Sequence, residues 1–377
     1  MPCFETQAPI ALSFAINAPA KGTGFARGIE ALTRRGKAGS KLTMASGSRP
    51  PLSKLASGAN GGKLVTRRGG AIAAGDRGQD SEAGAAFIHV APCSMPLPVL
   101  IAVPHAGRAY PGAVLAEMRD AGLSQLRLED RHVDAVGVEI ARATGTGLLV
   151  AHAPRAMLDL NRAADDIDWE MVEGGAKGNP QARRYGSNAR ARSGLGLVPR
   201  RLPGFGEIWR SRLPREELLR RVDDIHQPYH DFLAKELKRI RDAWGAALLI
   251  DLHSMPPLRR PSGEERAPQI VLGDRFGASC HSTLASRAFR YLELHGCAAA
   301  HNRPYSGGYV LDRHAEPARG IHGLQIELCR STYLDASLSE PTAAVKPLAR
   351  MLAGLVRELG AETAGLGASG ELAQAAE

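Results

Sequence analysis

Residues 247–255 read Ala-Leu-Leu-Ile-Asp-Leu-His-Ser-Met, an apolar run that carries Asp251 and His253 at its end. Two other segments have the same form: Val-Leu-Ile-Ala-Val-Pro-His ends on His105, and Gly-Leu-Gln-Ile-Glu ends on Glu327. A continuous apolar run is typical of a buried strand, and open α/β sheets bind ligands beyond the carboxyl ends of their strands. Because imidazoles and carboxylates are the ligands of catalytic zinc, the three segments together favour a metal-dependent hydrolase.

Strands and helices are expected to alternate along most of the chain. The hydrophobic pattern predicts strands at residues 86–90, 97–103, 147–152, 247–252, 269–272 and 324–328, and helices at 126–144, 216–244, 282–295 and 342–359. Alternation of this kind is typical of an α/β fold, in which helices cover both faces of a central sheet. Residues 165–214 contain many Gly and Arg residues and predict a long loop, of the kind that covers a binding site.

The composition divides the chain into three parts. Residues 1–85 are basic and rich in Gly, Ala, Ser and Arg, with weak hydrophobic periodicity, so we expect a disordered extension without functional residues. Two other interpretations stay open: an organelle transit peptide, since such leaders are poor in acidic residues and contain Arg and Ser, or sequence upstream of the true start. Residues 86–360 form the predicted catalytic domain, and residues 361–377, rich in Ala and Gly, are expected to form a flexible tail.

Composition also limits the expected partners and location. The net charge of +9 arises mostly in residues 1–85, which hold 12 Lys and Arg against 5 Asp and Glu, whereas the other 292 residues hold 36 against 34. We therefore expect no nucleic-acid partner. No apolar stretch approaches the ~20 residues of a membrane span, so we expect no membrane partner. Five scattered cysteines without a Cys-x-x-Cys pair favour a reducing compartment, hence the cytoplasm.

His105 and His253 each stand where a predicted strand ends. Asp251 precedes His253 by two residues, so both side chains point to the same side of the strand, and Asp251 could orient the His253 ring. A single histidine in this position is ordinarily a surface residue. Two such histidines in one chain favour metal binding.

A third ligand is expected from the acidic segment 129–134. Glu129, Asp130, His132 and Asp134 are all candidates, because residues four apart share one face of a helix. Acidic residues at a helix N-terminus also stabilise the helix dipole without any metal. The residues alone leave this choice open.

Glu327 lies inside the apolar strand Leu-Gln-Ile-Glu-Leu-Cys. An isolated buried charge is costly, so the carboxylate is expected to be functional or paired with Arg330. Beside a metal, Glu327 could take a proton from water and pass it to a leaving amine. We favour this catalytic role.

Two further segments carry groups suited to binding carboxylates. Arg155, Asn161 and Arg162 form a predicted anion clamp, since guanidinium groups match carboxylate geometry. The second segment is a glycine-containing loop that offers an amide and two phenol groups, on Asn302, Tyr305 and Tyr309. For any one of these residues, an ordinary place in a polar loop is an equally good interpretation.

Several ordered motifs between about Phe87 and Leu359 resemble those of the N-formylglutamate amidohydrolase family. They include Pro-His-Ala-Gly-Arg at His105, Glu-Asp-Arg-His-Val-Asp at Asp130, Leu-Asp-Leu-Asn-Arg at Asn161, Asp-Leu-His-Ser-Met-Pro at His253, Asn-Arg-Pro-Tyr-Ser-Gly-Gly-Tyr at Asn302, Gly-Leu-Gly-Leu-Val-Pro-Arg at Arg200 and Leu-Gln-Ile-Glu-Leu at Glu327. The family is similar to zinc carboxypeptidases and aspartoacylases.

The resemblance implies a phosphorylase/hydrolase-like fold, with a central mixed β-sheet flanked by helices on both faces. It implies hydrolysis of N-formyl-L-glutamate to glutamate and formate, late in histidine breakdown. Zinc carboxypeptidases use a His-x-x-Glu motif, but here the third residue after His105 is Arg108. By motif position, the zinc ligands are then His105, Asp130 and His253.

The remaining roles follow from the same resemblance. Glu327 would be the general base, Arg155 (or Arg162) would stabilise the oxyanion, and one zinc or another divalent ion would be bound per chain. The substrate would contact Asn161, Arg162, Asn302, Tyr305 and Tyr309. Two alternatives stay open: hydrolysis of another N-acyl or peptide substrate, and non-catalytic binding of a dicarboxylate. The sequence does not predict the oligomeric state.

Overall fold

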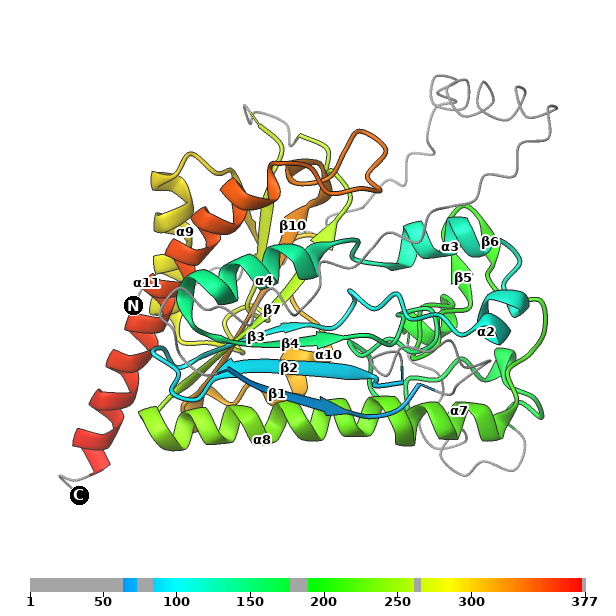
Figure 1. Ribbon diagram of the computed structural model, residues 1–377, viewed down its shortest axis with the longest axis horizontal. Helices are drawn as coiled ribbons and strands as arrows, with labels where there is room; N and C mark the ends of the chain where they lie inside the picture. Colours follow the sequence, from blue (N-terminus) through cyan, green and yellow to red (C-terminus); the bar gives the residue numbers. More distant parts are fainter. Residues whose placement is uncertain (1–63, 73–83, 177–188, 261–265, 375–377) are drawn as a thin grey trace, which may run out of the picture. The chain divides into compact units, whose positions relative to one another are not determined.

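The computed structural model describes residues 64–72, 84–176, 189–260 and 266–374. Within them, eight strands form one mixed sheet in the order β1-β2-β4-β3-β7-β10-β8-β9 (Figure 1). The strands are β1 (Leu64–Gly69), β2 (Phe87–Pro92), β3 (Val99–Val103), β4 (Gly147–Ala151), β7 (Ala247–Met255), β8 (Ile270–Gly273), β9 (Ala299–His301) and β10 (Ile321–Cys329). Each predicted strand overlaps one of these, and the expected α/β fold with a mixed sheet is confirmed.

The centre of the sheet is parallel. Strands β4, β3, β7 and β10 run in the same direction, whereas β1, β2 and β8 pair antiparallel to their inner neighbours. The carboxyl ends of β3, β7 and β10 therefore lie side by side at one edge of the sheet. These are the three strands that carry, or lead into, His105, His253 and Glu327.

Helices cover both faces of the sheet. One face packs against α4 (Val133–Thr144), α9 (Ser282–Leu294) and α11 (Val345–Gln374), and the other against α8 (Gln227–Trp244) and α10 (Tyr309–His314) (Figure 1). In β3, Ile101 and Leu100 belong to opposite cores, because successive side chains point to opposite faces. Two separate apolar cores thus hold the central strands rigidly.

The predicted helix 126–144 is instead two helices, α3 (Ala121–Leu128) and α4. Residues 129–132 form a non-helical connection in which His132 adopts a left-handed conformation with φ of 56°. The backbone N–H of Asp130 donates to the carbonyl of His105 at 3.0 Å. This tertiary hydrogen bond draws the connection towards the end of β3, so the helix cannot continue through it.

The predicted helix 216–244 is also subdivided. It consists of α7 (Arg215–Arg221), a π-turn at Val222–His226 and α8. The predicted loop 165–214 contains a short 3-10 helix at Trp169–Met171, the short helix α6 (Ala189–Arg192) and the small pair β5 (Arg201–Leu202) and β6 (Gly206–Glu207). Its residues 177–188 lie outside the described residues.

Near the start of the domain, α2 (Gly112–Glu117) precedes α3.

Both predicted ends of the domain need correction. Residues 64–69 form β1, paired antiparallel with β2, so the expected disorder of residues 1–85 is wrong for this segment; most of the rest lies outside the described residues. Helix α11 continues to Gln374 rather than ending near Leu359. Gly367 permits this longer helix because it has no side chain where it packs on the backbone of Trp244. A Cβ at position 367 would lie 2.1 Å from the Trp244 carbonyl oxygen.

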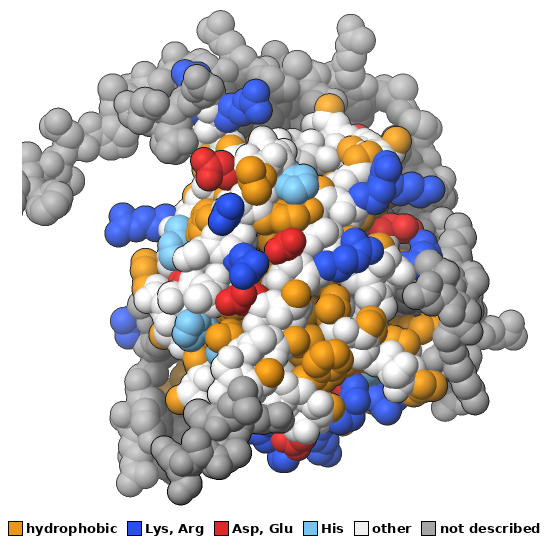
Figure 2. Space-filling view, turned by 90° about the vertical axis from the view of Figure 1, so that its left-hand side faces the viewer, with side chains coloured by type: hydrophobic (Ala, Val, Ile, Leu, Met, Phe, Trp, Pro, Cys, Tyr) orange, Lys and Arg blue, Asp and Glu red, His pale blue; other side chains and the backbone are white. Residues whose placement is uncertain are grey.

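One face of the described surface mixes side chains of all kinds. On the face drawn in Figure 2, basic, acidic and apolar groups are interspersed rather than gathered by type. Across the described residues, no helix combines the length and the apolar character that crossing a bilayer requires.

Candidate active site

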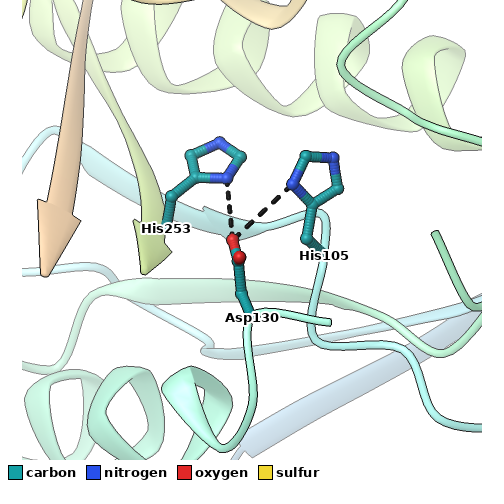
Figure 3. Close-up of side chains that lie close together, drawn as sticks. All are labelled: His105, Asp130 and His253. Atoms are coloured by element: carbon teal, nitrogen blue, oxygen red, sulfur yellow. Dashed lines mark hydrogen bonds and ion pairs between the residues drawn. The ribbon is translucent and has the colours of Figure 1, made fainter. Parts of the chain in front are cut away.

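His105, Asp130 and His253 meet at the carboxyl edge of the sheet. Nδ1 of His253 lies 3.0 Å from Oδ2 of Asp130, and Nδ1 of His105 lies 3.6 Å from the same oxygen (Figure 3). The two imidazole rings are 4.7 Å apart between centroids. One nitrogen or oxygen atom from each residue lies within 4.8 Å of the other two, close enough for a shared metal ion.

The other nitrogen of each ring is held by a second carboxylate. Nε2 of His105 lies 2.7 Å from Oδ1 of Asp159, and Nε2 of His253 lies 2.9 Å from Oδ2 of Asp251. These contacts turn both Nδ1 atoms towards Asp130. Carboxylates that orient histidine ligands in this way are usual around protein-bound metals. The role expected of Asp251 is therefore what the structure shows.

The charges of this cluster suit a cation. Four buried carboxylates, on Asp130, Asp159, Asp251 and Glu327, surround the two imidazoles. Burial alone would raise the pKa of Asp130, but the two histidines beside it, one of them hydrogen-bonded to it, hold it below its usual value. Burial would likewise lower the pKa of His253, yet the Asp251 and Asp130 carboxylates raise it well above its usual range.

The donor atoms also fit a divalent metal. Among the described residues, Nδ1 of His105 has no hydrogen-bond partner although it is buried. A buried polar atom without a partner is costly. Two imidazole nitrogens and a carboxylate oxygen form a usual catalytic zinc set, so the residues present fit the metal that the sequence predicted.

The other acidic candidates of segment 129–134 are used elsewhere. Glu129 pairs with Arg131 at 3.1 Å, and Asp134 pairs with Arg108 at 2.8 Å. The latter contact also accounts for Arg108 at the position where carboxypeptidases have a glutamate. Of the segment, it is Asp130 that the structure brings to the two histidines.

Glu327 lies beside this cluster. Its backbone is the register partner of His253 across the parallel strands β10 and β7. The side chain accepts a hydrogen bond from Nε2 of Gln325 at 3.0 Å, and burial raises its pKa to about 7. Arg330, the expected structural partner, instead donates to Ser254 at 3.1 Å and to the Glu129 carbonyl.

A cavity of about 240 Å³ opens onto these groups. It is lined by His105, Asp130, His253 and Glu327, and also by Arg155, Asn161, Arg162 and Tyr305. Its walls further include Arg127, Arg190, Gln325 and Arg330. Five guanidinium groups thus share one small space with the candidate metal ligands, an arrangement that suits a small substrate with carboxylate groups.

The predicted anion clamp is built on the segment that carries Asp159. Nε of Arg155 donates to Asp159 at 2.9 Å, and the backbone N–H of Asn161 donates to the same side chain at 2.8 Å. The amide oxygen of Asn161 accepts from the backbone of Val310 at 2.9 Å. Arg162 is buried and donates to the carbonyl of Asn161 at 2.7 Å.

Two predicted substrate contacts are not brought to the cavity. Asn302 is buried and forms two hydrogen bonds with Asp274. Its amide nitrogen donates to the Asp274 carboxylate at 2.7 Å, and its amide oxygen accepts from the Asp274 backbone N–H at 3.0 Å. The hydroxyl of Tyr309 accepts from Arg313 at 2.8 Å, and its ring stacks on that of His226. Both residues are thus engaged in holding the chain that surrounds the cavity.

Sequence reasoning missed several residues of the site. Asp159 stands two residues before Asn161 in a motif already singled out, and Gln325 stands two residues before Glu327 on the same strand face. Strand alternation could have found Gln325, and Asp159 could have been found as the acidic residue of its motif. Arg127 and Arg190 have no comparable signal, because tertiary packing alone brings them to the cavity.

The sequence of the chain matches a known protein family. Residues 97–334 match the family model of N-formylglutamate amidohydrolase. The chain belongs to the N-formylglutamate amidohydrolase family. The matched range includes every cavity residue named above, and membership confirms the expected hydrolase acting on a linear amide.

Individual relatives agree. An N-formylglutamate deformylase of Pseudomonas aeruginosa is 30% identical over 275 residues, which cover 70% of this chain and 91% of the relative. One of Pseudomonas putida is 31% identical over 263 residues, 66% of this chain and 89% of that protein. The crystal structure of N-formylglutamate amidohydrolase from Ralstonia eutropha JMP134 aligns with a TM-score of 0.65 and 30% identity, covering 74% and 98% of the two chains.

Proposed function

We propose that this enzyme hydrolyses N-formyl-L-glutamate to L-glutamate and formate and depends on one divalent metal ion, most simply zinc. The observation that carries the proposal is the convergence of His105, Asp130 and His253 beside Glu327. The named activity of the relatives supports the same substrate. We further propose a cytoplasmic enzyme of histidine breakdown, in keeping with the four cysteines that the structure describes, which are free.

The metal would be held by Nδ1 of His105, Nδ1 of His253 and Oδ2 of Asp130. When bound, such an ion supplies Lewis acidity, which polarises a carbonyl group and lowers the pKa of water towards neutrality. Asp159 and Asp251 keep the two rings in the orientation that binding requires.

Glu327 is the general base and acid of the proposed reaction. Its carboxylate takes a proton from the attacking water, whose oxygen adds to the formyl carbon. The same carboxyl then delivers the proton to the amide nitrogen as the C–N bond breaks, which releases formate and the amine of glutamate. Its raised pKa, about 7, suits both roles near neutral pH.

Arginines supply the remaining electrostatic stabilisation. Arg155 is fixed by Asp159 and faces the cavity, so it would stabilise the negative charge that develops on the carbonyl oxygen. Asn161, Arg162 and Tyr305 line the same cavity and would bind the carboxylates of glutamate. Asn302 and Tyr309 would act indirectly, by holding the loop that carries Tyr305 and the helix α10 that follows it.

The test is formate and glutamate release by the purified chain from N-formyl-L-glutamate. A panel that adds N-acetyl-L-glutamate, N-formyl-L-leucine and a dipeptide separates the proposed activity from hydrolysis of another N-acyl group or of a peptide bond. We expect N-formyl-L-glutamate to give the highest kcat/KM. Tight binding of dicarboxylates without any hydrolysis would contradict the proposal and would favour a binding protein.

A further inference from the structure

Gln325 occupies a position in the cavity that the proposed mechanism does not yet use. It lies on β10 two residues before Glu327, so the two side chains share one face of the sheet. Gln325 is only 3% exposed, yet it lines the cavity. Nε2 of Gln325 donates to Oε1 of Glu327 at 3.0 Å.

The other end of this amide has no partner. Among the described residues, none donates a hydrogen bond to Oε1 of Gln325. While Glu327 is ionised, as the proposed base must be, its contact with Gln325 fixes the orientation of the amide, because an amide oxygen turned towards a carboxylate would be repelled. The amide oxygen is therefore a fixed, buried acceptor on a residue that lines the cavity, and leaving such an atom unpaired is unfavourable.

The proposed substrate has only acceptors at neutral pH, except for one group. The carbonyl oxygen and the two carboxylates of N-formylglutamate accept hydrogen bonds, whereas the scissile amide carries its single N–H donor. The nitrogen of this amide must also come close to Glu327, since it receives the proton from that residue. A fixed acceptor beside Glu327 matches this donor in both chemistry and place.

We propose that Oε1 of Gln325 accepts a hydrogen bond from the N–H of the scissile amide, which makes Gln325 a further catalytic residue. The inference rests on the proposed function. No bond to Gln325 is made or broken: the N–H is kept throughout hydrolysis, and its direction sets the nitrogen lone pair towards Glu327. The site then prefers a secondary amide over an ester of the same shape.

A competing arrangement uses the neighbouring strand. Asp251 is the register partner of Gln325, and its Oδ1 also has no hydrogen-bond partner among the described residues. A water between the two side chains would satisfy both atoms without any substrate. Asp251 does not line the cavity, however, whereas Gln325 does.

The test compares Gln325→Met, which keeps the shape and removes both polar groups, with the wild-type chain on two substrates. One is N-formyl-L-glutamate and the other is its ester analogue, 2-formyloxyglutarate, which has an oxygen in place of the N–H. We expect kcat/KM to fall about tenfold to a hundredfold on the amide and less than about threefold on the ester. Gln325→Glu, which keeps an acceptor oxygen, should retain the wild-type ratio of amide to ester.

Equal losses on both substrates, or no loss on the amide, would overturn the inference, because Gln325 would then act only through Glu327 or through a water. A wild-type chain that releases no formate would contradict the proposed function instead. In that case the dissociation constants of the amide and the ester are measured for the wild-type and Gln325→Met proteins. A loss of affinity confined to the amide would still support the role of Gln325, and equal losses would overturn it. Melting curves and metal content of both variants check that the fold and the metal site are intact.

Discussion

His253 on β7 and Glu327 on β10 face each other as register partners in the parallel part of the sheet. One is a metal-ligand candidate and the other the proposed base, so the ladder of backbone hydrogen bonds between the strands sets their separation. Asp251 and Gln325 form the next pair on the same face. A pair fixed in a buried sheet is positioned more precisely than one carried on loops.

The first prediction concerns Glu327. Glu327→Gln keeps the shape of the side chain but removes its basicity, so we expect kcat to fall by about 10²–10⁴-fold. Metal content should stay that of the wild type, because this residue is not among the three ligands. Turnover and metal analysis of one preparation check both points. Activity near that of the wild type would rule out Glu327 as the base.

The pH dependence of the reaction should reflect the same carboxyl group. Because the base must be ionised and its pKa is raised to about 7, kcat/KM should fall as the pH drops below about 7. Stability of the metal-free chain should change in the opposite sense. Glu327 keeps its proton up to about pH 7 in the folded state but loses it near pH 4.5 in the unfolded state. Its contribution to the free energy of unfolding therefore falls as the pH rises from 4.5 to 7.

Chemical denaturation of the metal-free chain at several pH values measures that contribution. Glu327→Gln should remove it and leave the variant the more stable protein above pH 7. A kcat/KM profile that stays flat down to pH 5 would show that a different group limits activity.

Asp251 should control metal affinity through His253. Asp251→Asn removes the charge that orients and polarises the ring, so we expect the metal dissociation constant to rise about 10–100-fold. Competition with a chromogenic chelator measures this constant. Asp223→Asn is the matched control, since Asp223 is exposed on the π-turn. Equal affinities for all three proteins would mean that Asp251 does not act on the metal through His253.

Gly308 should control how the clamp is placed. A Cβ at this position would lie 2.5 Å from the amide oxygen of Asn161, so Gly308→Ala must displace that side chain. We expect KM for N-formyl-L-glutamate to rise about tenfold while metal content is unchanged. In Gly112→Ala, the control, the added Cβ meets nothing within 4 Å. A KM unchanged in Gly308→Ala would remove Asn161 from the substrate contacts.

The sequence predicted those parts of the site that strand periodicity determines. His105, His253 and Glu327 stand at the ends of buried runs, and parallel strands bring such ends together. Asp130 could be chosen only by resemblance. Its position depends on the break between α3 and α4, which a left-handed His132 and a hydrogen bond to His105 create, and neither appears in hydrophobic spacing.

Other parts depend on tertiary contacts. Strand β1 was missed because its Leu-Val-Thr-Arg-Arg-Gly sequence carries little apolar signal until it pairs with β2. Asn302 has the composition of a substrate contact, yet Asp274 uses both ends of its amide. Which polar group turns to the cavity and which to a neighbour is decided by packing that the sequence does not display.

Dependence on one bound metal ion is measured by titrating the metal-depleted full chain with zinc and following formate release from N-formyl-L-glutamate at each addition. We expect the depleted chain to be inactive and activity to reach its maximum at one zinc per chain. Full formate release by the metal-depleted chain would contradict this dependence.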